Sequence, residues 1–156
     1  MRTLREVVRV DHSDAEVAIA LLELQRLAYE VEAALIGSRD IPTLTETLEE
    51  LQGSRETFLA VFVEGRIAGT VSYRLLRDTI DIHRLAVDPT CFRGGIGTAL
   101  VRAALRAEPS ATHAIVQTGA GNEPARSLYL REGFEQTDEL EVAPGLRVTR
   151  YRMPLR

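Results

Sequence analysis

Asp81 and His83 are the residues of this sequence whose types and spacing best suit proton transfer. They lie in the segment TIDIHRLAV (79–87), which is rich in β-branched residues and predicts a strand. Residues two apart on a strand share a face, so Asp81 and His83 point one way while Ile80 and Ile82 point the other. Two polar groups on one face of a central strand are not expected in a core. A histidine with a pKa near 6.5 accepts a proton with little adjustment, whereas an aspartate near 3.9 needs burial to raise its pKa.

We expect Asp81 and His83 to act together as a base. The alternative is structural: Asp81 caps the strand or pairs with Arg84, and His83 is an ordinary half-buried histidine. Glu30 and Glu32, in the first predicted helix, are rival bases. Charged residues on such a helix more often form its solvated face.

A glycine-rich stretch follows this strand directly. In DPTCFRGGIGTAL (88–100) three glycines fall within four positions, between the apolar residues LAV and the predicted helix TALVRAAL. The first turn of a helix has unpaired N–H groups and a partial positive charge, and glycines let the backbone approach a bound phosphate. The stretch therefore suits a phosphate site, with Arg93 as a charged donor, although a glycine turn that only joins strand to helix would look the same. The spacing matches neither a Walker A loop nor a dinucleotide-binding fingerprint.

The hydrophobic periodicity predicts the elements that must position these residues. Strands are expected over 3–10, 57–63, 66–76, 79–87 and 112–118 and in a final hairpin around APG (143–145), with Glu64-Gly65 as a tight turn; helices are expected over 13–37, 42–53, 95–107 and 122–133. Ser13 or Asp14 should cap the first helix, and Glu46 falls in the first turn of the second. The order βααβββαβαββ indicates an α/β fold of the α+β kind, in which helices cover one mixed sheet.

Composition limits the function classes. The chain has 156 residues, 45% hydrophobic and 27% charged, with a net charge of −4, so residues 1–156 are expected to form one domain that binds neither nucleic acid nor a membrane. No apolar run approaches the roughly 18 residues of a membrane helix. The single cysteine, Cys91, excludes an intrachain disulfide and a CxxC metal site, so we expect no metal and a cytoplasmic location.

Two segments together resemble a known family. IHRLAVDPTCFRGGIGTALVRAAL is similar to the signature of the GNAT superfamily, the acetyl-CoA-dependent N-acyltransferases, and GNEPARSLYLREGF (121–134) is similar to its downstream N-x-x-A-x-x-x-Y-x-x-x-G-F segment. The order of elements also agrees, so the resemblance covers nearly the whole chain. One departure is that Phe92 stands where the family carries Gln or Arg, with Arg93 one position later.

The resemblance implies an N-acetyltransferase that uses acetyl-CoA as the acyl donor. The loop 93–98 (Arg93, Gly94, Gly95, Ile96, Gly97 and Thr98) would bind the CoA pyrophosphate, and the backbone of Leu85, Ala86 and Val87 would pair with the pantetheine arm. Asn122 would contact the same arm, or else only cap its helix. Tyr129 would lie near the sulfur and assist departure of the thiolate, or else only pack on the sheet. Asp81 and His83 occupy positions where family members carry a base.

The acceptor is expected to be a small-molecule or peptide amine. Tyr29, Glu30 and Glu32 lie in the region that sets specificity in the family, and their carboxylates would attract a cationic amine. Homodimers are common in the family, so a homodimer is a candidate state. A second hypothesis is a non-catalytic acyl-CoA-binding regulatory module on the same fold, which would need no base.

Overall fold

The computed structural model describes residues 6–37, 45–92 and 94–155. The elements along the chain are β1 (Val7–Val10), α1 (Ala15–Ile36), α2 (Leu48–Gln52), β2 (Thr57–Val63), β3 (Arg66–Leu76), β4 (Thr79–Val87), a 3₁₀ turn η2 (Pro89–Cys91), α3 (Ile96–Arg106), β5 (His113–Gly119), α4 (Glu123–Arg131), β6 (Glu135–Ala143) and β7 (Leu146–Pro154). This is the predicted order of strands and α-helices, and the predicted α/β fold class is confirmed.

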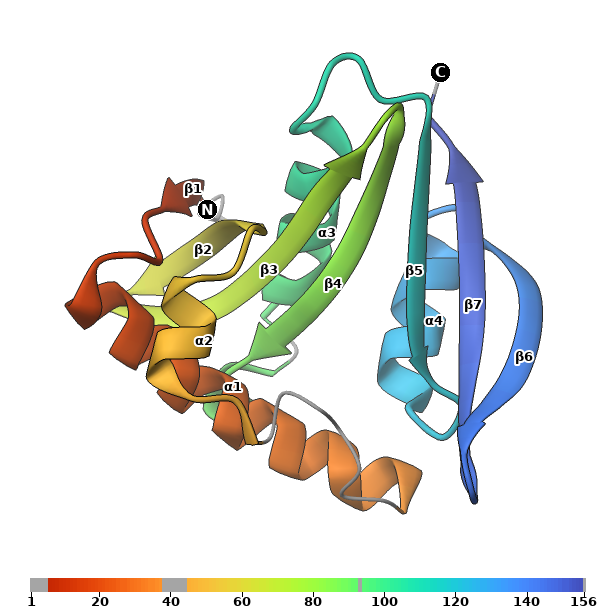
Figure 1. Cartoon of the computed structure of the whole chain (residues 1–156), viewed down its shortest axis with the longest axis horizontal. Helices are drawn as coiled ribbons and strands as arrows, with labels where there is room; N and C mark the ends of the chain where they lie inside the picture. Colours follow the sequence, from red (N-terminus) through yellow and green to blue (C-terminus); the bar gives the residue numbers. More distant parts are fainter. Residues whose placement is uncertain (1–5, 38–44, 93, 156) are drawn as a thin grey trace.

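The strands form a seven-stranded sheet in the order β1-β2-β3-β4-β5-β7-β6. The pairing of β4 with β5 is parallel and the other pairings are antiparallel. The parallel pairing joins Thr79–Ile82 of β4 to His113–Val116 of β5 and stops there among the described residues. Beyond it the two strands separate toward their C-terminal ends (Figure 1). The C-terminal half of β4 therefore has one edge unpaired.

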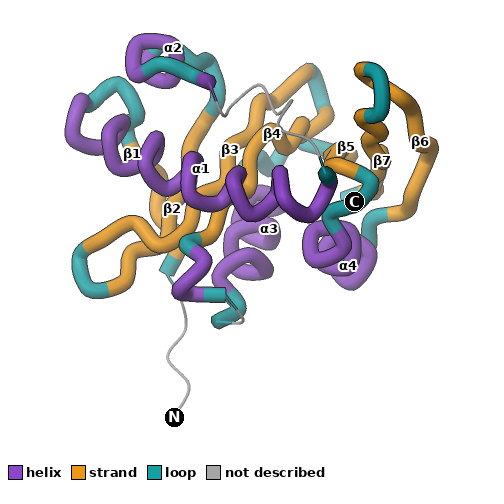
Figure 2. The backbone as a smooth tube through the Cα atoms, turned by 90° about the horizontal axis from the view of Figure 1, so that it is seen from below, coloured by secondary structure: helices purple, strands orange, loops and turns teal. Residues whose placement is uncertain are grey.

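Helices cover both faces of the sheet. Figure 2 shows α2 on one side of the strands and α3 and α4 on the other, with α1 crossing the strand ends. The larger apolar cluster lies under α3 and α4 and includes Ile80, Ile82, Leu100 and Tyr151. A second cluster joins α1 and α2 to the opposite face through Phe58 of β2. Within the described ranges, none of the helices combines the length and apolarity needed to cross a membrane.

Local signals fix several element ends as predicted. Asp14 caps α1 by accepting hydrogen bonds from the N–H groups of Glu16 and Val17, and Gly37 ends that helix in the left-handed region. Glu64 and Gly65 both have positive φ, 52° and 77°, as a two-residue hairpin turn requires. These ends depend on neighbours in the sequence, which is why the sequence predicts them.

Two predicted bounds need correction. The second helix was expected from residue 42, but α2 begins at Leu48 because Thr47 and Glu50 form a capping box. Glu46 therefore precedes the helix and does not lie in its first turn. The first strand was expected over 3–10, and the structure has Val7–Val10. Residues 3–5 of that prediction, and 42–44 of the helix prediction, lie outside the described residues.

A β-bulge in β4 reverses the direction of its side chains. Ser72 of β3 pairs with Arg84 and Tyr73 pairs with Ile82, so His83 is an extra residue between them. In a regular strand Ile82 and Arg84 would share a face. Here Ile82 packs in the cluster under α3, while Arg84 contacts Gln25 of α1 on the opposite face.

Candidate active site

Asp81 and His83 lie on the same face of β4 and contact one another. The distance between His83 Nε2 and Asp81 Oδ2 is 3.0 Å, and His83 Nδ1 lies 3.7 Å from Glu56 Oε1. The hydrogen bond with Asp81, helped by the charges of Asp81 and Glu56, raises the pKa of His83 against the opposing effects of burial and Arg74. The side chains of His83 and Asp81 are 34% and 26% exposed, so both remain accessible to a ligand.

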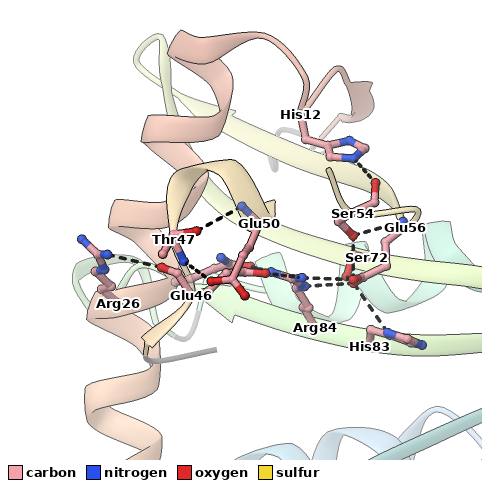
Figure 3. Close-up of polar contacts among 11 residues, drawn as sticks. His12, Arg26, Glu46, Thr47, Glu50, Ser54, Glu56, Ser72, His83 and Arg84 are labelled. Atoms are coloured by element: carbon pink, nitrogen blue, oxygen red, sulfur yellow. Dashed lines mark hydrogen bonds and ion pairs between the residues drawn. The ribbon is translucent and has the colours of Figure 1, made fainter. Parts of the chain in front are cut away.

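Arg84 is the buried centre of a polar network beside this pair (Figure 3). Its guanidinium donates to Glu46 Oε1 and Oε2 at 2.5 and 2.9 Å, to Glu56 Oε1 and Oε2 at 2.9 and 3.0 Å, and to Gln25 Oε1 at 3.1 Å. Ser72 also donates to Glu56. The network joins α1, the segment before α2, the residue just before β2, and strands β3 and β4.

The charges in this network are matched. Burial alone would lower the pKa of Arg84, but its hydrogen bonds with Glu46 and Glu56 raise it. Burial alone would raise the pKa of Glu56, and the hydrogen bonds from Arg84 and Ser72 hold it below its usual value. Both groups therefore stay ionised near neutral pH. Glu56 links the network to His83, so the histidine lies next to a fixed negative charge.

The glycine stretch begins α3 in an unusual way. Asp14, Thr47 and Asn122 cap the other α-helices with their side chains, whereas in the described part of the chain no side chain caps α3. Gly95 holds the N-cap position with φ of 78°, and a Cβ there would have no neighbour within 4 Å. The first N–H groups of α3, from Ile96 onward, lack carbonyl partners within the helix. These amides are therefore available to a bound anion.

The predicted loop residues lie around this helix start. Gly94 and Gly95 are exposed, Gly97 and Thr98 are half-buried and Ile96 is buried. Arg93 lies outside the described residues. Leu85, Ala86 and Val87 belong to the half of β4 that β5 leaves unpaired.

Asn122 and Tyr129 of α4 lie close to the far end of α1. Asn122 Oδ1 accepts a hydrogen bond from the N–H of Ala125, so it caps α4, and its side chain also hydrogen-bonds with Glu32. Burial raises the pKa of Glu32. A Cβ at Gly121 would lie 2.9 Å from the carbonyl oxygen of Leu35, so a glycine there lets α1 approach the loop before Asn122.

Tyr129 is 3% exposed and its ring contacts those of Phe134 and Tyr151, with centroids 5.6 and 5.9 Å away. Burial, followed by the nearby charge of Glu32, raises the pKa of Tyr129 well above its usual value. Its hydroxyl therefore stays protonated across the neutral range. Tyr129 packs in the core, as the structural alternative expects. These contacts involve its ring, so they are compatible with a chemical role for its hydroxyl.

The three acceptor-site candidates on α1 differ in position. Tyr29 is buried and packs with Leu24 and Ala86, Glu30 is exposed, and Glu32 is half-buried beside Asn122.

Cys91 is half-buried at the edge of the core with its Sγ 3.8 Å from Thr90 Oγ1. In the ranges that the structure describes, His, Cys, Asp and Glu side chains form no group of three or more suited to a metal ion.

A cavity of about 520 Å³ lies where β4 and β5 begin to separate. Asp81 and His83 line it from β4, Gln117 from β5, and Arg150 and Arg152 from β7. Its size is within the range of small-molecule pockets. The predicted base thus lies in a cavity wide enough for a reactant.

Sequence reasoning missed the arginines that line this cavity from β7 and the polar network centred on Arg84. Arg150 and Arg152 come from the last strand, whose pairing with β5 no local pattern reveals. Arg84 was considered only as a partner for Asp81, and the structure pairs Asp81 with His83 instead. Glu56 gave no signal either, since it precedes a strand without any motif around it.

Comparison with protein families decides the class of the protein. Residues 19–134 match the acetyltransferase (GNAT) family. The chain belongs to the GNAT family. This confirms the resemblance drawn from the two sequence segments.

A curated relative and two solved structures agree with this assignment. The chain is 33% identical over 144 residues to UPF0157 protein YqkA of Bacillus subtilis (strain 168); the match covers 92% of this chain and 42% of that protein, so the chain spans less than half of that relative. The ribosomal-protein-S18-alanine N-acetyltransferase from Escherichia coli has a TM-score of 0.75 at 17% identity, covering 97% of this chain and 94% of the other. The PaiA N-acetyltransferase from Thermoplasma acidophilum, solved in complex with coenzyme A, has a TM-score of 0.76 at 16% identity, covering 95% and 98%. Both structures share the GNAT fold.

Proposed function

We propose that this chain transfers an acetyl group from acetyl-CoA to an amine, with Asp81 and His83 as the base. The observation that carries the proposal is the 3.0 Å contact between these side chains in a cavity at the point where β4 and β5 separate. Family membership supplies the reaction class. Acetyl-CoA would supply the acetyl group as a thioester.

The described residues fit such a donor. The uncapped start of α3 presents the N–H groups of Ile96, Gly97 and Thr98, which would hold the pyrophosphate together with Gly94 and Gly95. The unpaired edge formed by Leu85, Ala86 and Val87 would hydrogen-bond to the amides of the pantetheine arm, as an added strand does. Arg93 and Asn122 complete the proposed contacts.

Removing a proton from the amine is the first chemical requirement. A lysine-like amine with a pKa near 10.4 is neutral about one time in a thousand near pH 7.4, which costs about 4 kcal/mol. His83 would accept this proton. Asp81 and Glu56 hold the imidazole between two carboxylates and raise its pKa, which makes it a stronger base than a free histidine.

Transfer then needs a leaving sulfur. The neutral amine nitrogen bonds to the thioester carbonyl carbon, the carbon–sulfur bond breaks, and the electron pair leaves with the sulfur as a thiolate. The nitrogen then gives up its extra proton and the thiolate takes one up, so that the products are a neutral amide and the free thiol of CoA. Tyr129 would donate a hydrogen bond to that sulfur. Because burial keeps its phenol protonated, Tyr129 can do so without losing its own proton to solvent.

The proposal extends to the domain, its location and its acceptor. Residues 1–156 would form one N-acetyltransferase domain that works in the cytoplasm without a metal, on a small-molecule or peptide amine. A homodimer is compatible with the proposal. The second candidate, a non-catalytic acyl-CoA-binding module, shares the contacts to CoA but requires no base, so the Asp81–His83 pair favours the enzyme.

Calorimetric titration with acetyl-CoA, combined with a thiol-release assay on a broad amine panel, tests the proposal. We expect binding, and we expect His83→Gln to lower turnover by roughly 10²- to 10⁴-fold with an unchanged acetyl-CoA Kd. His113→Gln is the matched control, because His113 lies on β5 outside the lining of the cavity and should keep full turnover. No binding at millimolar acetyl-CoA would refute the function. Binding without any transfer by the unchanged protein would favour the regulatory module.

A further inference from the structure

A row of side chains crosses four strands on the face of the sheet that carries the cavity. Arg74 of β3 pairs with Asp81 of β4, Asp81 with Ile115 of β5, and Ile115 with Arg152 of β7. Directly paired residues share a face, so this row places Asp81 and the apolar Ile115 between two cations, and Glu135 of β6 continues it beyond Arg152. Asp81, Ile115 and Arg152 line the cavity.

The cavity therefore has walls of opposite charge. Asp81 and His83, with Glu56 behind the histidine, form the anionic wall on β4. Arg150 and Arg152 form the opposite wall on β7. Ile115 and Gln117 of β5 form the floor between the walls and carry no charge.

The two arginines differ in their partners. Arg150 donates to both carboxylate oxygens of Asp138, at 3.0 and 2.7 Å, so its charge is largely balanced. Arg152 is exposed and has no ion pair with any of the residues that the structure describes, although Glu135 lies opposite it on β6. Its planar guanidinium is thus free to bind a carboxylate through two parallel hydrogen bonds.

We propose that the acceptor carries its own carboxylate, which Arg152 binds while the amine of the same molecule faces Asp81 and His83. This inference rests on the proposed function and narrows its acceptor to a free amino acid or a short peptide. The backbones of Asp81 and Arg152 are two strand spacings apart, about 10 Å, so the amine and the carboxylate are separated by no more than about that distance. A polyamine or an aminoglycoside would instead place a second cation against Arg152.

Matched acceptors test the charge requirement. The assay measures kcat/KM by thiol release with the common amino acids, a set of dipeptides, and the carboxamide of each. Spermidine and an aminoglycoside complete the panel. For the best acceptor, we expect the free carboxylate to exceed its carboxamide by at least tenfold. Arg152→Gln should abolish this preference by raising KM for the carboxylate, with kcat and the rate on the carboxamide little changed.

Arg147→Gln is the control, because Arg147 lies on the same strand and is exposed but does not line the cavity. It should keep the full preference. Equal rates on carboxylate and carboxamide in the unchanged protein, or a preference that survives Arg152→Gln, would overturn the inference. Transfer to spermidine or the aminoglycoside alone would overturn it too and leave the proposed function standing. Failure of the protein to bind acetyl-CoA would overturn both.

Discussion

Tyr129→Phe is the substitution that most directly tests how the thiolate leaves. It removes one hydroxyl and keeps the ring, whose contacts with Phe134 and Tyr151 do not need that oxygen. A hydrogen bond to a charged group contributes about 1.5–3 kcal/mol. If the hydroxyl stabilises the sulfur only as charge develops on it, kcat should fall by about 10- to 150-fold.

The assay separates this role from a structural one. We expect the acetyl-CoA Kd of Tyr129→Phe to be unchanged in a calorimetric titration, and urea unfolding to show a loss of at most about 1 kcal/mol. Tyr73→Phe is the matched control, because Tyr73 is equally buried and its hydroxyl donates to Glu108 at 2.9 Å on another part of the sheet. It should lose a similar amount of stability and keep its kcat.

Two results would refute the reasoning about Tyr129. An unchanged kcat would mean that solvent or another group stabilises the thiolate. A loss of acetyl-CoA affinity as large as the loss in kcat would make the hydroxyl a binding contact and not a group that acts in the transition state.

The remaining predictions concern the network and the base. Arg84→Met leaves Glu46 and Glu56 without their cation in a largely buried position, so urea unfolding should show a loss of about 3–5 kcal/mol. Arg84 lowers the pKa of Glu56 in the unchanged protein, so this loss should shrink as the pH falls and Glu56 gains a proton; a loss under about 1 kcal/mol near neutral pH would contradict the matched-charge account. Asp81→Asn removes the main cause of the raised pKa of His83, so the acidic limb of kcat/KM, measured from pH 5 to 9, should move to lower pH. An unmoved limb would exclude His83 as the group that titrates.

Much of the fold was predictable because its signals are local. Asp14, Gly37 and the Glu64-Gly65 turn act on their immediate neighbours, and they appear where the sequence places them. The start of α2 was equally local, since the Thr47 and Glu50 capping box is visible in the sequence, but the proline at position 42 drew the predicted helix start too far upstream.

The candidate site was predictable only in part. The spacing of Asp81 and His83 indicated one shared face, and the glycines indicated a helix start that an anion can approach. The acid strength of Glu32 and Tyr129 was not predictable, because it depends on α1 and α4 packing together. Burial raises the pKa of both groups, and the charge of Glu32 raises that of Tyr129 further although the two residues lie far apart in the sequence.

The sequence by itself determined the order of elements, the family and one wall of the cavity, because short-range periodicity and two segments that resemble the family's motifs encode them. Only the tertiary structure decided where Arg84 points and what faces the base. The bulge at His83 turns Arg84 away from Ile82 and into the network, although simple alternation would place both on one face. The register of β7 against β5 brings Arg152 to the cavity. Both depend on the register between paired strands, which side-chain alternation within a single strand does not specify.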